Sequence, residues 1–180
     1  MKKITRPYLL KNKRYFDKRG FFQELFLQKS FNTKSIFTAL AFSKKNVIRG
    51  MHFQRKNKQT KIITVLSGEI LDVSVNLRKK SKDFGKVFYF YMSEGESVYI
   101  PNYYAHGYEC LSKNSLILYH LDNYRDVKNE CGIPFDDKFL KIKWQTNKPI
   151  LSKRDKSHED FLSFKKKNYF FIIFFDLNML

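Results

Sequence analysis

The sequence predicts an all-β fold, a sandwich or a barrel, with helix limited to short flanking segments. Three observations lead to this prediction. Short runs with strand character recur along the chain, apolar and polar residues alternate within them, and only seven Gly and four Pro separate them. Repeated strands at such spacing, with turn signals between them, are typical of antiparallel sandwiches and barrels. The predicted strands are Phe21–Leu27, Lys61–Leu66, Glu69–Leu77, Lys86–Met92, Ser97–Ile100 and Ser115–His120.

The stretch from Lys61 to Leu77 carries the clearest strand pattern. Its apolar residues take alternate positions on both sides of Ser67-Gly68, which is a turn signal. This pattern predicts a β-hairpin with one buried face. The alternating apolar residues are Ile63, Val65, Leu71, Val73, Val75 and Leu77.

The length of 180 residues suits one compact domain, and 43% hydrophobic residues supply enough apolar surface for a core. No linker or internal repeat divides the chain, so we expect one domain in residues 1–160 and a peripheral tail in residues 161–180. The tail joins Lys165-Lys166-Lys167 to an aromatic run at 169–175, far shorter than the ~20 residues of a membrane helix. Our hypothesis is that the tail packs against the protein or is dispensable. The alternatives are contact with a membrane surface and addition of a strand to a neighbouring subunit.

The net charge of +18 indicates either a polyanionic partner or a crowded cationic surface. The lysines are scattered and no groove-reading motif is present, so we expect no nucleic-acid partner and favour a phosphate-bearing small ligand. Cys110 and Cys131 favour reduced thiols in the cytoplasm, although one bridge between them stays open. The basic start of the chain lacks the apolar region of a signal peptide, so secretion is not expected.

Two of the four histidines, His52 and His106, lie in dense polar and aromatic surroundings. His52 follows Arg49 by three residues and precedes Lys61 by nine, so a strand and its partner can present an imidazole base beside two cations. His106 lies between a proline and Gly107, and a turn there would bring the imidazole to the mouth of a barrel. A hydrogen-bonded structural role is the alternative for each histidine.

Further motifs accompany these histidines in order along about residues 15–156. They are Asp17 to Glu24, Val47 to Gln54, Gln59 to Lys61, Gly68 to Val73, Leu77 to Ser81, Ile100-Pro101, Ala105 to Gly107, Leu118-Tyr119 and Leu151 to Asp155. In this order they resemble the motifs of the dTDP-4-dehydrorhamnose 3,5-epimerases, which belong to the cupin-like jelly-roll families. The resemblance implies a cupin-like jelly roll, a nucleotide-diphospho-sugar substrate, a homodimer, and deoxysugar biosynthesis for surface polysaccharide such as O-antigen. It implies no cofactor and no metal.

The resemblance also assigns roles to individual residues. His52 would be the base, oriented by Asp155, with Tyr119 as the proton donor on the opposite face and Lys61 beside the developing oxyanion. In the implied dimer, Arg19 would reach the neighbouring site. The residues implied to bind substrate are Arg19, Glu24, Arg49, Gln54, His106, Glu130 and Arg154.

These roles suit the chemistry of an epimerase acting beside a ketone. A 4-keto group acidifies the C–H bonds at C3 and C5, because loss of either proton gives an enolate whose charge rests on the ketone oxygen. A cation beside that oxygen lowers the barrier. Inversion requires the proton to return from the opposite face, which a base on one wall and a phenol on the other can achieve.

Several residues depart from the pattern or have a plain structural alternative. Phe37-Thr38-Ala39 stands where a polar stretch usually contacts the nucleotide, so the base identity is open. Arg125, Asn76 and Arg154 replace the usual Tyr, Asp and Lys, and these departures are candidates for a change in selectivity between C3 and C5. The structural alternatives are an edge-strand ion pair for Arg19 and Glu24, a solvated charge for Glu130, and a structural carboxylate for Asp72.

Three other functions compete with the 3,5-epimerase. One is a single-site 3- or 5-epimerase that acts on a CDP- or GDP-linked sugar. Another is a metal-dependent cupin, which closely spaced histidines would favour, but His106 and His120 are fourteen residues apart. The last is a non-catalytic binding module, against which the joint presence of His52, Lys61, Tyr119 and Asp155 argues.

Overall fold

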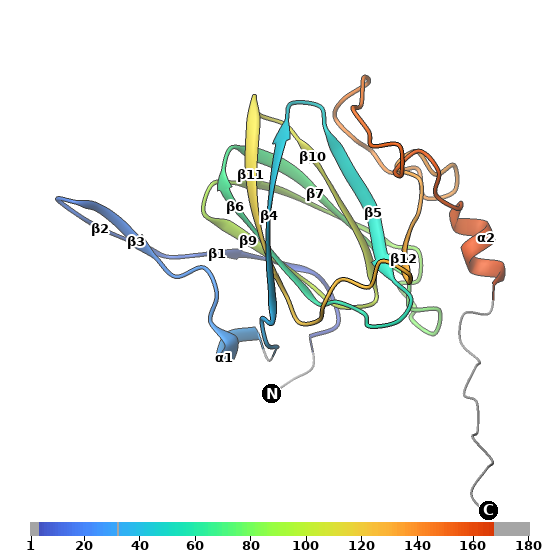
Figure 1. The fold of residues 1–180 in the computed structure, drawn as a ribbon, viewed down its shortest axis with the longest axis horizontal. Helices are drawn as coiled ribbons and strands as arrows, with labels where there is room; N and C mark the ends of the chain where they lie inside the picture. The colour runs from blue at the N-terminus through green and yellow to red at the C-terminus, as the bar shows by residue number, and fades with distance from the viewer. Residues whose placement is uncertain (1–3, 32, 168–180) are drawn as a thin grey trace, which may run out of the picture.

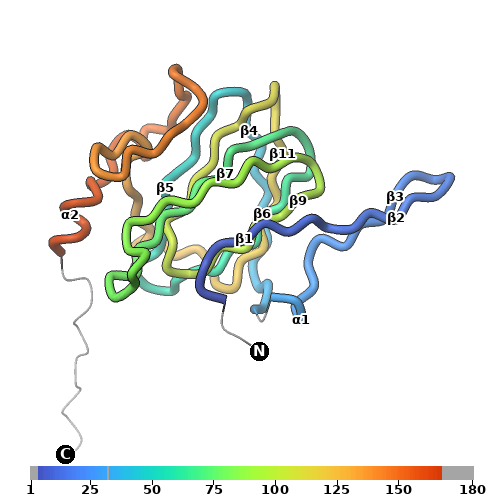
Figure 2. The backbone as a smooth tube through the Cα atoms, turned by 180° about the vertical axis from the view of Figure 1, so that it is seen from behind, coloured from blue at the N-terminus to red at the C-terminus, as the bar shows by residue number. Residues whose placement is uncertain are grey.

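The computed structural model describes residues 4–31 and 33–167, and these form a jelly roll of two facing antiparallel sheets (Figures 1 and 2). Sheet 1 has the strand order β1-β9-β6-β11-β4 and sheet 2 the order β12-β5-β10-β7-β8. Sheet 1 consists of β1 (Tyr8–Lys11), β4 (Phe37–Lys44), β6 (Lys61–Ser67), β9 (Glu96–Ile100) and β11 (Asn114–Leu121). Sheet 2 consists of β5 (Ile48–Gln54), β7 (Glu69–Asn76), β8 (Val87–Ser93), β10 (Tyr104–Cys110) and β12 (Glu130–Gly132).

Two short helices and a two-stranded hairpin flank the sheets. The hairpin of β2 (Arg14–Asp17) and β3 (Gly20–Gln23) projects away from the body of the molecule (Figure 1). Helix α1 (Gln28–Phe31) follows it, and helix α2 (Phe161–Lys166) lies at the far side beside sheet 2. The all-β prediction with short flanking helices is therefore confirmed.

Five of the six predicted strands correspond to β6, β7, β8, β9 and β11 to within two residues at each end. The predicted strand Phe21–Leu27 is shorter in the structure, because β3 ends at Gln23 and the chain then leaves the hairpin toward α1. Strands β5 and β10, which carry the candidate histidines, are not among the six predicted strands, although a strand was considered for His52. Both are buried on two faces, so they lack the alternation that marks a half-exposed strand.

The predicted hairpin of residues 61–77 is wrong. Strand β6 pairs with β9 and β11 in sheet 1, whereas β7 pairs with β8 and β10 in sheet 2. Gly68 carries the chain from one sheet to the other with φ +84°, and a Cβ there would lie 2.2 Å from the carbonyl oxygen of Asn114. The expectation of a single buried face also fails, because nearly every residue of both strands is buried.

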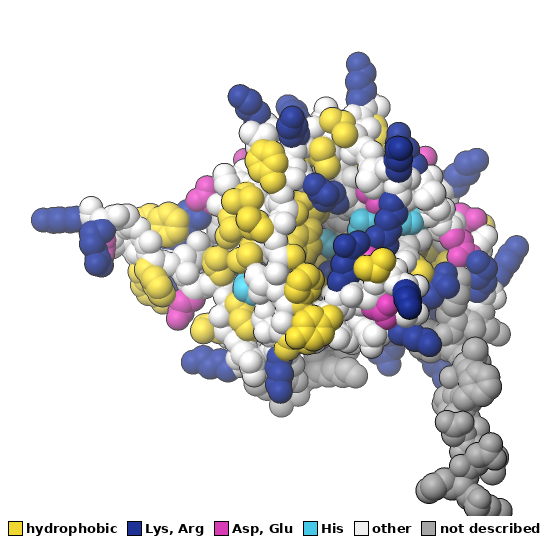
Figure 3. Space-filling model, viewed as in Figure 1, with side chains coloured by type: hydrophobic (Ala, Val, Ile, Leu, Met, Phe, Trp, Pro, Cys, Tyr) yellow, Lys and Arg dark blue, Asp and Glu magenta, His cyan; other side chains and the backbone are white. Residues whose placement is uncertain are grey.

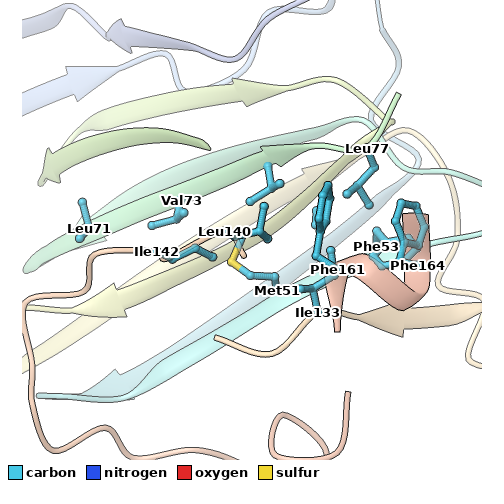
Figure 4. Packing of buried hydrophobic residues seen from close by; sticks show 12 residues of the cluster. Met51, Phe53, Leu71, Val73, Leu77, Ile133, Leu140, Ile142, Phe161 and Phe164 are labelled. Atoms are coloured by element: carbon cyan, nitrogen blue, oxygen red, sulfur yellow. The ribbon is translucent and has the colours of Figure 1, made fainter. Parts of the chain in front are cut away.

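The two faces of β7 bury different kinds of residue. Leu71 and Val73 face away from sheet 1, under a layer formed by the C-terminal part of the chain (Figure 4), and Val75 belongs to the same buried cluster. On the inner face, Asp72 and Ser74 are completely buried opposite β10 tyrosine and histidine side chains. The interior between the sheets is therefore polar at one end, although an apolar cluster fills the rest.

The C-terminal layer includes residues that were expected to be peripheral. Asp160 caps α2 by accepting a hydrogen bond from the Ser163 backbone N–H. The helix then buries Phe164 against Phe53 and Phe161 beside Phe164 (Figure 4). Burial of an aromatic side chain of this size stabilises the fold by about 1.5–3 kcal/mol. The core thus extends beyond residue 160, the expected boundary.

The aromatic run at 169–175 lies outside the described residues, so the expectations about it stay untested. Within residues 4–31 and 33–167, no helix is long and apolar enough to cross a membrane. Cys110 and Cys131 are both free thiols.

Candidate active site

His52 lies on the inner face of sheet 2 because of a β-bulge between β5 and β10. His52 is opposite His106 and Arg49 is opposite Tyr108, so two residues of β5 face the single Gly107 of β10. In a regular strand a three-residue spacing would put Arg49 and His52 on opposite faces, whereas the extra residue turns both inward.

Two glycines make this bulge possible. A Cβ on Gly50 would lie 2.5 Å from the Gly107 Cα, and one on Gly107 would lie 2.7 Å from the Arg49 carbonyl oxygen. Gly107 therefore serves backbone packing inside β10. The predicted turn at Gly107 is wrong, and His106 is buried between the sheets at 4% exposure instead of lying at a barrel mouth.

Asp155 holds the imidazole of His52. The His52 Nε2 lies 2.6 Å from Asp155 Oδ1, although 103 residues separate the two in sequence. Burial alone would raise the pKa of Asp155, but the polar contacts of its carboxylate with the His158 and His52 imidazoles outweigh burial and hold this pKa well below its usual range. Because the carboxylate is ionised it can only accept, so His52 Nε2 carries the proton and Nδ1 keeps the lone pair of a base.

Lys61 places a cation beside His52. It is the first residue of β6 in sheet 1, it is 9% exposed, and its Nζ donates to the His52 carbonyl oxygen at 3.3 Å. Burial lowers the pKa of Lys61 to about 8, and attraction to Glu130 and Asp72 limits the decrease. The ammonium is therefore still mostly charged at neutral pH, in a setting where charge acts strongly.

His106 forms a second imidazole–carboxylate pair with Asp72. The His106 Nε2 lies 2.6 Å from Asp72 Oδ2, and the side chains are 4% and 0% exposed. Burial lowers the pKa of His106, while Asp72 opposes the decrease and Lys61 and His52 add to it. A neutral His106 can bind a polar ligand by hydrogen bonds without adding charge. Asp72, for which a structural role was one of two alternatives from sequence, thus orients a predicted site residue.

Tyr119 faces these histidines from the opposite sheet. It lies on β11 of sheet 1, and its ring meets that of His106 edge-on at a centroid distance of 6.3 Å. Burial, with Tyr108 and Asp72 nearby, raises the pKa of Tyr119 well above its usual value, and Arg49 opposes the increase. The phenol is therefore protonated at neutral pH and can donate a proton.

A carboxylate with two guanidinium partners lies at the edge of the site. Glu130 on β12 accepts from Arg125 at 2.8 Å and pairs with Arg154 at 2.9 Å, and it is only 13% exposed. Burial would raise the pKa of Glu130, but the two arginines lower it overall. The solvated-charge alternative for Glu130 is therefore wrong, and the two departures Arg125 and Arg154 belong to one cluster.

Gln54 and Asn76 are held in structural hydrogen bonds. The Gln54 amide donates to the carbonyl oxygens of Asn57 and Tyr124, and its Oε1 accepts from the Asp126 backbone N–H. Asn76 is buried and donates to the Tyr104 hydroxyl. Gln54 therefore fixes the loop before Glu130, and its predicted contact with substrate stays a prediction.

The remaining predicted residues lie apart from this cluster or at its rim. Arg49 donates to the Ser43 hydroxyl at 2.9 Å and to the Phe42 carbonyl oxygen. Arg19 is 90% exposed in the β2–β3 turn and pairs with Asp17 at 2.6 Å, so the ion pair considered with Glu24 does not form. Glu24 is exposed just beyond β3. Neither Arg19 nor Glu24 joins His52 within this chain.

The first residues of β4, where the sequence departs from the expected polar stretch, lie beside Tyr119. Ala39 is its register partner, so a small apolar side chain lies beside the phenol. Figure 3 shows histidine side chains recessed between a hydrophobic band over β4 and β11 and a group of Lys and Arg side chains over β5 and β12. The site therefore has one apolar wall and one cationic wall.

His158 was missed from sequence. Its Nε2 lies 3.4 Å from Asp155 Oδ1, and its ring meets that of His52 edge-on at 5.5 Å between centroids. A His three residues after Asp155 was the available signal, but the C-terminal segment lacked any pattern that placed it beside β5.

Comparisons with known proteins identify relatives of this chain. Residues 2–163 match the sequence model of the dTDP-4-dehydrorhamnose 3,5-epimerase family. A relative of that name from Salmonella typhimurium is 36% identical over 158 residues, which are 82% of this chain and 86% of the relative. The crystal structure of the enzyme from Sulfolobus tokodaii is 35% identical, with a TM-score of 0.80 and coverage of 89% and 91%.

A further structure is that of the Legionella pneumophila enzyme in complex with dTDP-4-keto-L-rhamnose. It is 30% identical, has a TM-score of 0.83, and covers 88% of this chain and 89% of its own. Three findings lead to one conclusion. The family model spans nearly the whole described chain, two of the relatives are more than 30% identical, and the fold is shared. The chain belongs to the dTDP-4-dehydrorhamnose 3,5-epimerase family.

Proposed function

We propose that the protein is an epimerase that inverts C3 and C5 of a nucleotide-linked 4-keto-6-deoxy hexose. One observation carries the proposal: the Asp155-held imidazole of His52 belongs to one sheet and the protonated phenol of Tyr119 to the facing sheet. A sugar ring between them has a base on one face and an acid on the other. That is the arrangement that inversion requires.

In the proposed mechanism, His52 Nδ1 removes the proton from the carbon next to the ketone. Asp155 stabilises the resulting imidazolium through the 2.6 Å hydrogen bond. The ammonium of Lys61, beside His52, stabilises the enolate oxygen. Tyr119 then delivers a proton to the opposite face of the carbon, and the inverted ketone leaves.

We propose dTDP as the nucleotide, because the names of the relatives specify it. The arginines at the rim supply planar, charged donors for a diphosphate, and Arg154 already lies at the edge of the site through Glu130. CDP- and GDP-linked sugars stay as alternatives, because Phe37-Thr38-Ala39 stands where a polar stretch usually contacts the nucleotide, and Ala39 is the register partner of Tyr119.

We also propose a homodimer in which Arg19 reaches the site of the partner. The β2–β3 hairpin projects from the body (Figure 1), and its aromatic residues Phe16 and Phe22 are 74% and 66% exposed. Leu40 and Phe42 on β4 are also more than half exposed. Apolar surface of this extent favours an interface, and a docked hairpin would bring Arg19 and Glu24 near a second molecule.

We further propose that the protein is cytoplasmic, that it acts in deoxysugar synthesis for surface polysaccharide, and that it is a single domain that includes α2. Free Cys110 and Cys131 support a reducing compartment. The burial of Phe161 supports one folding unit.

The test is solvent hydrogen exchange in D₂O with dTDP-, CDP- and GDP-linked 4-keto-6-deoxy sugars, followed by NMR at C3 and C5. We expect deuterium at both carbons with the dTDP sugar. His52→Asn should slow exchange by roughly 10²- to 10⁴-fold, whereas the matched variant His120→Asn, outside the site, should not. Absence of exchange with all three sugars would overturn the function, and exchange at one carbon only would identify a single-site epimerase.

A further inference from the structure

His158 brings a third potential metal ligand to the His52–Asp155 pair. One donor atom from each of His52, Asp155 and His158 lies within 4.8 Å of the others. The His158 side chain is 7% exposed, and its Nε2 is buried without a hydrogen bond of good geometry. A buried imidazole nitrogen directed at a carboxylate, yet only loosely paired with it, is a donor suited to a cation.

Gly132 makes room for this third ligand. It is the register partner of His52 across β12 and β5, and a Cβ at this position would lie 2.4 Å from the His158 ring. The ring of His158 therefore rests on the glycine backbone next to His52. Any larger residue at 132 would displace His158 from the other two ligands.

The distances agree with those of a tetrahedral transition-metal site. Zinc lies about 2.0–2.2 Å from His nitrogen and carboxylate oxygen, so two ligand atoms on one ion are roughly 3.3–3.5 Å apart. His158 Nε2 and Asp155 Oδ1 are already separated by 3.4 Å. The His52 Nε2 and Asp155 Oδ1, now 2.6 Å apart, need to separate by less than about 1 Å.

We propose that His52, Asp155 and His158 form a binding site for Zn²⁺ or a similar divalent transition metal, and that binding there switches the base off. Two imidazoles and one carboxylate are ligands that these ions favour, and a fourth position stays open to water. The ion is an inhibitor in this proposal and takes no part in the reaction.

The inhibitory effect follows from the tautomer of His52, and it rests on the proposed function. Without metal, Nε2 carries the proton toward Asp155 and Nδ1 has the lone pair that accepts the substrate proton. A metal on Nε2 takes the lone pair of that nitrogen, so the ring proton moves to Nδ1. The imidazole then has no free lone pair, and the carboxylate charge is shared with the ion.

Metal binding is measured first, independently of turnover. Isothermal titration with ZnCl₂ and the visible absorption of bound Co²⁺ should both give one site in the wild-type protein. His158→Asn should weaken binding by at least roughly 10- to 100-fold, the loss known for changes around metal sites. The matched control His120→Asn removes an imidazole that bonds Ser35 elsewhere, and should bind as the wild type does.

Gly132→Ala is the second variant, because it displaces the His158 ring and keeps all three ligands. It should also lose binding, and circular dichroism checks that each variant is folded. Epimerisation is then followed with increasing Zn²⁺, each variant being compared with its own metal-free rate. Zn²⁺ should inhibit the wild type and His120→Asn strongly, whereas His158→Asn should need at least tenfold more metal.

Equal metal affinity in the wild type and His158→Asn, or no binding at all, overturns the site. Binding without inhibition overturns the switch. If the protein turns over none of the sugar nucleotides, the proposed function fails, but calorimetry and the Co²⁺ spectrum still decide the metal site.

Discussion

Lys61→Met should make the protein more stable and much less active. The ammonium of Lys61 is 9% exposed, and burial lowers its pKa from 10.5 to about 8. That difference corresponds to about 3 kcal/mol by which folding disfavours the charged form. At pH 7 the folded protein bears this cost, because Lys61 is protonated in both the folded and the unfolded state.

The pH dependence has a definite sign. Between pH 8 and 10.5 the unfolded chain binds the Lys61 proton and the folded protein does not, so the Lys61 contribution to stability rises with pH in this window. In Lys61→Met the rise should vanish. The variant should be about 1–3 kcal/mol more stable at pH 7, the lower figure applying if the lost hydrogen bond to the His52 carbonyl offsets part of the gain.

Activity should change in the opposite sense. Without the cation beside the enolate oxygen, kcat should fall by roughly 10²- to 10³-fold, as for loss of one oxyanion donor. In the wild type, kcat/KM should decline on the alkaline side near pH 8 as Lys61 loses its proton, and Lys61→Arg should move that decline to higher pH. Urea denaturation at pH 7 and initial rates from pH 6 to 10 measure both effects. A Lys61→Met protein less stable than the wild type, or a wild-type rate flat through pH 8, would refute this reasoning.

Three further predictions follow from the fold and the site. Tyr119→Phe should retain deuterium exchange from the His52 face, whereas its rate of net inversion should fall by roughly 10²-fold or more. NMR measures both as the ratio of the exchange rate to the rate of product formation. A ratio equal to that of the wild type would remove Tyr119 from the donor role. Phe161→Ala should lower the free energy of unfolding, measured by urea denaturation, by about 3–5 kcal/mol, because the side chain is 1% exposed. Truncation after Lys167 should leave the free energy of unfolding and the reaction rate unchanged. A loss of less than about 1 kcal/mol in Phe161→Ala would show that α2 is peripheral. In Gly107→Ala the added Cβ would lie 2.7 Å from the Arg49 carbonyl oxygen and should displace the bulge that orients His52. The kcat of the variant should therefore fall even under conditions in which the protein remains folded. Wild-type kinetics in this variant would show that the bulge does not orient the base.

Local patterns account for the part of the fold that sequence predicted. Alternation of apolar residues placed β6 to β9 and β11, because a strand turns successive side chains to opposite faces whatever its partners are. The same pattern does not identify the partner. The chain from Lys61 to Leu77 therefore suggested a hairpin, whereas pairing with β9 and β10 put its two halves in different sheets.

Motif order allowed His52, Lys61, Tyr119 and Asp155 to be named from sequence as one site. Their geometry was not accessible, because the bulge depends on two glycines from different strands and the His52–Asp155 bond spans 103 residues. The same reason hid His158, which reaches the base only because the C-terminal segment packs back over sheet 2.

By itself, then, the sequence determined the all-β class of fold, which follows from residue type and local spacing. It indicated the chemical groups of the site through the resemblance of its motif order to a known family. Only the tertiary structure decided which groups meet: Asp155 and His158 on His52, Asp72 on His106, and Arg125 with Arg154 on Glu130. Such contacts arise from strand pairing and from packing of the C-terminal layer, and these depend on the whole chain rather than on any local stretch.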